Sequence, residues 1–69
     1  MDKNKLLYFV KDRGYKIEDF CKAIDMSYSN FYVKCRDSKF FLKEIWRIAE
    51  VLHLSIEDID SIFFVHLVS

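Results

Sequence analysis

The sequence predicts an all-α fold in which short helices pack into one bundle. Its 69 residues include no proline and a single glycine, Gly14, whereas an all-β domain needs many turn-forming residues. Apolar residues make up 52% of the chain and recur at the three- and four-residue intervals of a helix, which predicts a packed core rather than disorder. A chain of this length suits one domain and is too short for two, so residues 1–69 are expected to form a single domain.

The first two helices are predicted from their apolar faces and from the residues at their ends. Residues 2–12 form the first helix, and Gly14 is suited to the left-handed backbone that often follows a helix. Residues 17–24 form the second helix. Lys16 precedes it at the N-cap position, where a lysine side chain cannot accept a hydrogen bond from the first turn.

The third helix follows a tight turn at residues 25–27. It is predicted over residues 28–36, and the hydroxyl of Ser27 is placed to accept a hydrogen bond from its first turn. Helices this short are not stable alone in water, so both helices that flank the turn must pack on the rest of the domain.

Two further helices complete the predicted bundle. Residues 42–52 carry an apolar stripe at helical spacing. Residues 56–63 follow Ser55, which forms with Asp58 a pair that resembles a capping box. The expected architecture is therefore a compact bundle of five helices.

Apolar positions on the third helix determine which of its sides faces outward. Phe31 and Cys35 are expected to be buried, which leaves a largely polar edge exposed to solvent. This outer edge consists of Ser29, Asn30, Val33 and Lys34. Its placement is the feature of the predicted bundle that suggests a function.

The charges of the chain cancel overall but are unevenly distributed. All 11 lysines and arginines lie within residues 1–47 together with seven of the 11 acidic residues, so this part carries a net charge of +4. Residues 48–69 carry −4. The asymmetry is compatible with an anionic partner for the basic part, and equally with association of two copies, basic part against acidic part.

The cysteine and histidine residues do not predict a metal or catalytic site. Cys21, Cys35, His53 and His66 lack the local spacing of zinc ligands, and no phosphate-binding glycine motif occurs. We therefore expect neither an enzyme nor a cofactor. Neither a signal peptide nor an apolar run long enough to span a membrane is predicted, so the cytoplasm, with both thiols reduced, is the expected location.

Two apolar features each have two interpretations. Residues 63–69 form an apolar tail that either packs on the core of the same chain or pairs with a second subunit in a dimer. Trp46 and Val51 lie outside the inward stripe of the fourth helix. They form either an interface patch or packing contacts with the fifth helix or the tail.

Several motifs together resemble a known family. A large-then-small pair at residues 20–21 suits the packing of two helices, a turn follows at 24–27, and an I-A-x-x-L-x-L-S pattern spans residues 48–55. With these motifs, residues 6–59 resemble the Cro/repressor type of helix-turn-helix domain, and among its members the very short phage regulators of Gram-positive hosts. The resemblance implies a five-helix, lambda-repressor-like bundle whose third helix contacts DNA.

The resemblance also implies a set of DNA-contacting residues on and beside the third helix. That helix would enter the major groove of double-stranded DNA, with two copies of the chain on a two-fold site. The residues that would approach bases or backbone are Tyr28, Ser29, Asn30, Tyr32 and Val33. Those near phosphates would be Lys16, Lys34, Arg36 and Lys39. Asn30 is the best candidate for base contact, because an amide can form two hydrogen bonds with adenine.

The chain departs from the family pattern at positions that bear on function. Where the family commonly has Thr or Ser followed by Gln, this chain has Lys16 and Ile17, and Asp25 replaces a frequent glycine. Few basic residues flank the third helix, which predicts weak, salt-sensitive DNA binding. Some short phage relatives are antirepressors that bind another repressor domain instead of operator DNA, and this role is the alternative hypothesis. A third hypothesis is an interaction module that uses the apolar tail and does not bind DNA.

Overall fold

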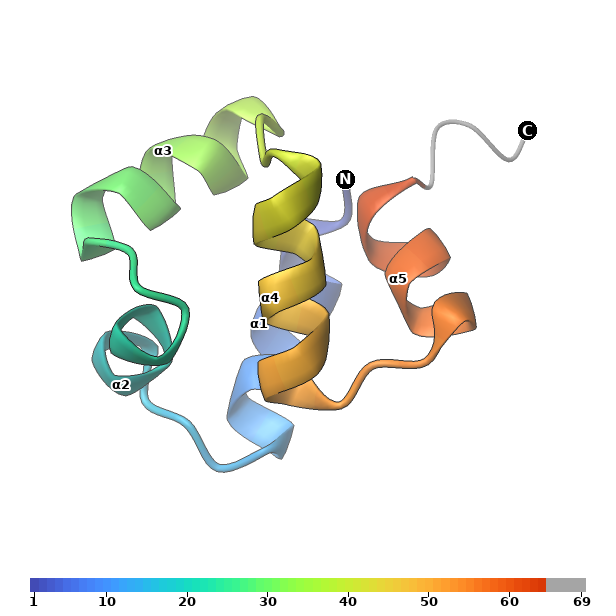
Figure 1. The fold of residues 1–69 in the computed structure, drawn as a ribbon, viewed down its shortest axis with the longest axis horizontal. Coiled ribbons are helices and arrows are strands. Elements are labelled where there is room, and N and C mark those ends of the chain that lie inside the picture. The colour runs from blue at the N-terminus through green and yellow to red at the C-terminus, as the bar shows by residue number, and fades with distance from the viewer. Residues whose placement is uncertain (65–69) are drawn as a thin grey trace.

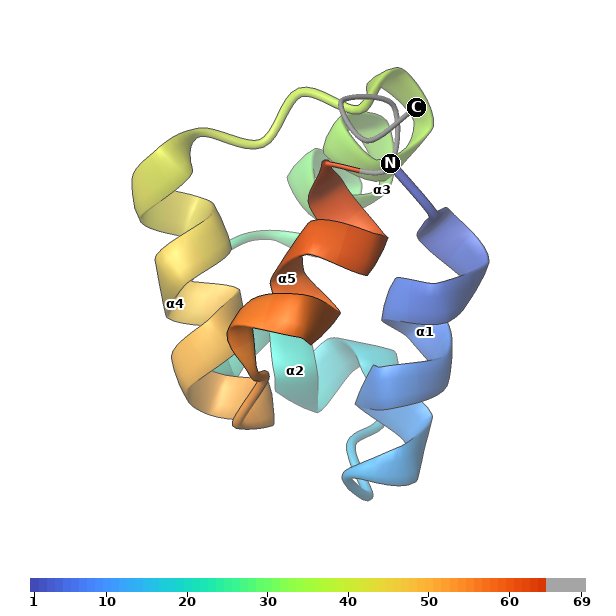
Figure 2. The same cartoon turned by 90° about the vertical axis from the view of Figure 1, so that its right-hand side faces the viewer.

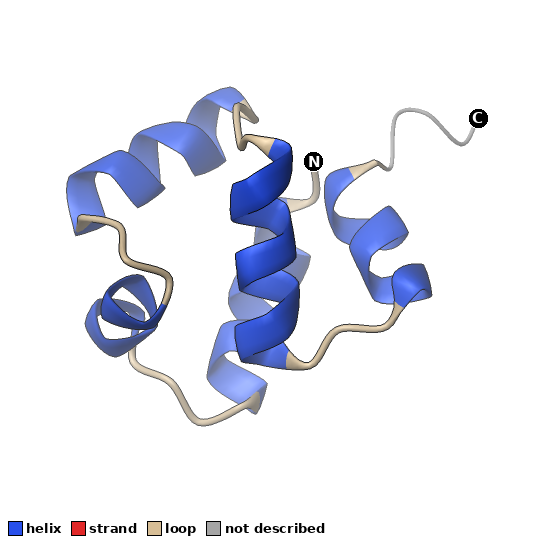
Figure 3. Cartoon of the chain, viewed as in Figure 1, coloured by secondary structure: helices blue, strands red, loops and turns tan. Residues whose placement is uncertain are grey.

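Five helices joined by short turns make up the part of the chain that the computed structural model describes, residues 1–64 (Figures 1 and 3). No strand occurs within these residues. The helices are α1 (Lys3–Asp12), α2 (Ile17–Ala23), α3 (Tyr28–Asp37), α4 (Leu42–Leu52) and α5 (Ile56–Phe63). The all-α, five-helix prediction is confirmed, and every helix begins and ends within one residue of its predicted position.

Side-chain caps fix the beginnings of the helices where the sequence predicted them. The Ser27 hydroxyl accepts a hydrogen bond from the backbone N–H of Asn30 at 3.1 Å. Ser55 and Asp58 form a reciprocal capping box, with both hydrogen bonds at 3.1 Å. Lys16 at the start of α2 provides no side-chain cap, as expected.

A residue with a left-handed backbone conformation follows each of the first four helices, although only one of these residues is glycine. Gly14 has a φ of +83°, and Asp25, Ser38 and His53 have φ values between 53° and 56°. Glycine adopts this backbone without steric cost, whereas a side chain bearing Cβ is strained in it. The ends of α2, α3 and α4 therefore retain backbone strain that the end of α1 lacks.

The core lies where α1, α2, α3 and α4 meet and extends to α5. It is built from fully or almost fully buried side chains: Leu6, Val10, Phe20, Cys21, Ile24, Phe31, Cys35, Ile48, Leu52 and Ile62. In Figure 2, α5 stands between α1 and α4, and it packs against both of them. This packing leaves α2 and α3 together on the other side of the molecule (Figure 1). No helix within residues 1–64 has the length and apolar character needed to cross a membrane.

The beginning of the predicted tail packs within the chain. Phe63 belongs to α5, and its ring meets Phe40 edge-on with centroids 5.8 Å apart. Phe64 is half-buried against a second, smaller cluster of buried residues that consists of Ile45, Ala49 and Ile59. Residues 65–69 lie outside the described residues, so a role for them in dimerisation stays a prediction.

Candidate nucleic-acid interface

The α2–turn–α3 unit is held together by a buried aromatic contact. Phe20 of α2 and Phe31 of α3 pack edge-to-face with ring centroids 5.6 Å apart. Arg47 of α4 stabilises the turn, because its guanidinium donates a hydrogen bond of 3.1 Å to the carbonyl of Ile24. This carbonyl is at the C-terminal end of α2, where the helix dipole favours a cation. Contacts from two sides therefore fix the orientation of α3.

Three of the four residues of the outer edge face solvent as expected. Ser29 and Asn30 are exposed, and 43% of Val33 is exposed. Phe31 and Cys35, on the opposite side of α3, are buried. The amide side chain of Asn30 makes no hydrogen bond within residues 1–64, so its donor and acceptor are available to a ligand.

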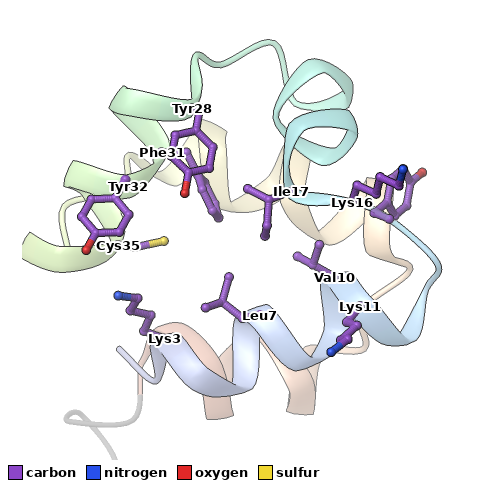
Figure 4. Close-up of a pocket in the computed structure, with 11 residues that line it drawn as sticks. Lys3, Leu7, Val10, Lys11, Lys16, Ile17, Tyr28, Phe31, Tyr32 and Cys35 are labelled. Carbon is purple, nitrogen blue, oxygen red and sulfur yellow. The ribbon is translucent and has the colours of Figure 1, made fainter.

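Tyr28 and Tyr32 stack on each other beside the outer edge. Their ring centroids are 6.4 Å apart with an interplanar angle of 20°, and about half of each residue is exposed. The ammonium group of Lys3 in α1 lies 4.9 Å from the centroid of the Tyr32 ring. Both tyrosines are therefore accessible to a ligand while also lining a groove between α1 and α3 (Figure 4).

The structure corrects the expected orientation of Lys34. Its ammonium group forms an ion pair with Glu44 of α4 at 3.1 Å, and only 19% of its side chain is exposed. The same ammonium group lies 4.4 Å from the centroid of the Phe41 ring. The prediction that Lys34 points outward is wrong, because the C-terminal half of α3 faces the beginning of α4. The Glu44 carboxylate also accepts a hydrogen bond from the Phe41 N–H at 2.8 Å, which fixes it in place.

The other predicted phosphate-contacting cations are exposed at two places. Lys16 lies at the beginning of α2, whereas Arg36 and Lys39 lie at the end of α3 and just after it. Arg36 donates hydrogen bonds of 3.0 and 3.4 Å to the carboxylate of Asp37. The guanidinium thereby lowers the pKa of the Asp37 carboxyl. Exposed pairs of this kind contribute little stability, so Arg36 can exchange Asp37 for a phosphate at small cost.

A comparison with family models identifies the class of this domain. Residues 5–62 match the model of the Cro/C1-type HTH DNA-binding domain. The chain belongs to this family. No curated protein and no solved structure matches the chain. Membership makes the chain a helix-turn-helix domain of the DNA-binding, transcription-regulating type, whose partner is DNA and which is typically not an enzyme.

Within this Cro/C1-type domain, the turn between α2 and α3 contains the departure from the family pattern noted in the sequence. Asp25 occupies a left-handed backbone with a φ of 56°, a conformation that a glycine would adopt more readily. Asp is among the few other residue types that tolerate it, which explains how the turn keeps its shape.

Sequence reasoning missed two contacts that position α3 in the Cro/C1-type domain. The first is the hydrogen bond from Arg47 to Ile24, and the second is the ion pair between Lys34 and Glu44. The residues of these pairs are 23 and 10 positions apart. No local pattern links residues at such separations. Only the presence of charged residues beside the apolar stripe of α4 could have indicated them.

The cysteines of the domain belong to its core. Cys21 and Cys35 are free and buried. Burial raises the pKa of both thiols, that of Cys35 to about 11 despite the nearby ammonium group of Lys3. Both groups are therefore neutral thiols at physiological pH, and neither has the lowered pKa of a reactive cysteine.

Proposed function

We propose that this domain regulates transcription by inserting α3 into the major groove of DNA. The observation that carries the proposal is the exposed first half of α3, where Ser29 and Asn30 point to solvent from a helix whose other side is buried. Bases are distinguished by hydrogen bonds in the major groove, and an unpaired amide such as that of Asn30 can bond adenine at two atoms. Tyr28, Tyr32 and Val33 flank this position and would contact adjoining bases or backbone.

Phosphate contacts in this proposal come from Lys16, Arg36 and Lys39. Each neutralised phosphate makes the slope of log K against log salt concentration more negative by about 0.9. Three contacts in each copy would therefore give a slope of about −2.7 for one copy and about −5.4 for two. Lys34 is not counted among these contacts, because Glu44 already neutralises it. This small set of cations supports weak binding that is lost as salt concentration rises.

We further propose that two copies bind a two-fold symmetric site. Helix-turn-helix dimers contact half-sites about one helical turn of DNA apart, roughly 34–36 Å. Homodimerisation through the tail at residues 63–69 would supply the symmetry. The phage or prophage origin and the cytoplasmic location are part of the same proposal, and the origin rests on the resemblance to short phage regulators.

Fluorescence anisotropy with labelled mixed-sequence duplexes at low and moderate salt tests the proposal. We expect binding at low salt that weakens steeply with added salt, and a loss of about 1–3 kcal/mol of binding free energy at a preferred site in Asn30→Ala. Asn4→Ala is the matched control, since Asn4 is also exposed but belongs to α1 and is not among the proposed DNA-contacting residues. Absence of binding at low salt, or equal effects of the two variants, would refute a role for Asn30 in contacting bases.

An antirepressor role is the second candidate, and exposed apolar side chains favour it. Phe41, Leu42 and Trp46 at the beginning of α4 are each more than half exposed. Within residues 1–64, Trp46 therefore makes no extensive packing contact with α5, whereas its packing on residues 65–69 of the tail lies outside the described residues. Aromatic residues of this kind are common anchors in protein interfaces. No DNA binding at low salt, together with a stable complex with a co-encoded repressor that Trp46→Ala weakens, would favour this function.

A further inference from the structure

A groove of about 500 Å³ opens between α1, α2 and α3 (Figure 4). Apolar side chains from all three helices line this α1–α3 groove, among them Leu7 and Val10 of α1, Ile17 of α2 and Phe31 of α3. Its volume falls within the range of about 300–1,000 Å³ that is typical of pockets for small organic ligands. The groove thus offers a concave apolar surface that the DNA-binding function does not require.

The charged residues that line the groove are all positive. They are Lys3, Lys11 and Lys16, and no acidic residue lines it. In Figure 4, Lys3 lies at one end beside Tyr32 and Cys35, and Lys16 lies at the other end. Lys3 has no ion-pair partner within the described residues 1–64. Its ammonium group instead lies 4.9 Å from the centroid of the Tyr32 ring. The groove therefore combines apolar walls with an uncompensated positive charge at its edge.

We propose that the α1–α3 groove binds a small amphiphilic anion, a carboxylate attached to an apolar chain or ring. The apolar part would lie against Leu7 and Phe31, and the carboxylate would pair with Lys3. A purely inorganic anion would leave the apolar walls unused, and a neutral apolar compound would leave Lys3 without a partner. Only a ligand with both parts matches the charge and the apolar surface together.

Ligand binding in the groove would bear on the proposed DNA contacts. Tyr28 and Tyr32 line the groove and also belong to the proposed DNA surface, as does Lys16. A bound anion would place negative charge beside this surface and would occupy the inner side of both tyrosines. We therefore expect octanoate to weaken DNA binding. This consequence rests on the proposed function, whereas binding of the anion itself does not.

Titration of the full isotope-labelled chain with octanoate, followed by amide chemical shifts, tests the ligand site. Saturable shifts are expected in α1, α3 and the beginning of α2. Affinity should rise from hexanoate to octanoate by about fourfold for each added methylene, as expected from the burial of a CH₂ group. The neutral amide octanamide has the same seven-carbon alkyl chain without the charge and should bind about threefold more weakly.

Three variants separate the parts of the site. Lys3→Gln should lower the affinity for octanoate to that for octanamide. Lys5→Gln is the matched control, because Lys5 lies on the same helix but does not line the groove. Leu7→Trp should fill the groove and abolish octanoate binding. If Leu7→Trp does not fold, Lys3→Gln decides the matter.

Four results would overturn the ligand proposal. The first three are the absence of saturable shifts, shifts centred outside the groove, and equal affinities for octanoate and octanamide. Displacement of octanoate by an acidic amphipathic peptide that binds far more tightly would identify the groove as a protein-docking site and would also overturn it. The octanoate titration contains no DNA and the anisotropy assay contains no octanoate. Failure of one proposal is therefore distinguishable from failure of the other.

Discussion

The two halves of α3 differ in what their side chains contact. Asn30 and Lys34 are one helical turn apart on the same edge, yet Asn30 is exposed and its amide has no partner within residues 1–64. Lys34 is paired with Glu44 and largely covered. The difference arises because α4 begins next to the second half of α3 and leaves the first half uncovered. Helical spacing determines the direction of a side chain, but the neighbouring element decides whether that direction leads to solvent.

The largest effect is expected at Phe31, the core residue that supports both halves of α3. Its ring lies 5.6 Å from that of Phe20 and 5.9 Å from that of Phe40, measured between centroids. Phe31→Ala should lower the free energy of unfolding by about 3–5 kcal/mol. The free energy of unfolding of a small domain is roughly 5 kcal/mol in total. Circular dichroism in urea should therefore show that the variant is largely unfolded. Val33→Ala, on the exposed side, should stay within about 0.5 kcal/mol of the parent chain.

A smaller effect is expected from breaking the contact that distinguishes the second half of α3. Lys34→Met leaves the half-buried Glu44 carboxylate without a counter-ion and should lower the free energy of unfolding by about 1–2 kcal/mol. The double variant with Glu44→Leu should recover only part of this loss, because Glu44→Leu also removes the hydrogen bond that the carboxylate accepts from the Phe41 N–H. DNA affinity and its salt slope should not change in either variant. A drop in DNA affinity at unchanged stability would instead show that Lys34 contacts phosphate, as the sequence first predicted.

The turn before α3 offers a substitution that should increase stability. Asp25→Gly relieves the left-handed strain at φ 56° and should raise the free energy of unfolding by about 0.5–1 kcal/mol in urea denaturation. Ala23→Gly, two residues earlier and inside α2, is the control and should lower it by up to about 1 kcal/mol. If both substitutions changed the free energy of unfolding in the same direction, the turn would not be strained.

A further effect is confined to alkaline pH and concerns the buried side of α3. The pKa of Cys35 is raised to about 11 from an ordinary value of 9.0, because burial disfavours the thiolate. The neutral thiol contributes its full stability below about pH 9, and this contribution is lost as the pH rises toward 11. The urea midpoint should therefore fall between pH 8 and pH 10 by a larger amount in the parent chain than in Cys35→Ala. If the urea midpoint fell equally with pH in the two chains, Cys35 would not titrate in this range.

The sequence was sufficient to predict the helices of this domain, because their signals are local. The caps at Ser27 and Ser55 and the left-handed position at Gly14 depend only on residues a few positions away. Apolar spacing then identified the buried face of each helix. These features explain why every helix boundary was predicted to within one residue.

The candidate site was predicted only in part, because part of it depends on tertiary contacts. The exposure of Ser29 and Asn30 follows from helical spacing alone. The ion pair of Lys34 and the groove beside Tyr28 depend on where α4 and α1 lie relative to α3. Such relations between separate helices are not encoded in any single window of sequence. The DNA-contacting roles of the predicted residues stay predictions.

The backbone hydrogen bond from the Asp2 N–H to the Ile62 carbonyl, at 2.6 Å, has a consequence for how the chain folds during its synthesis. It joins the start of α1 to the end of α5, and Leu6 and Ile62 share one buried cluster. Helix α1 therefore acquires its last neighbour only when α5 emerges from the ribosome. Until then the apolar face of α1 stays partly uncovered, so we expect the bundle to close only after α5 has emerged.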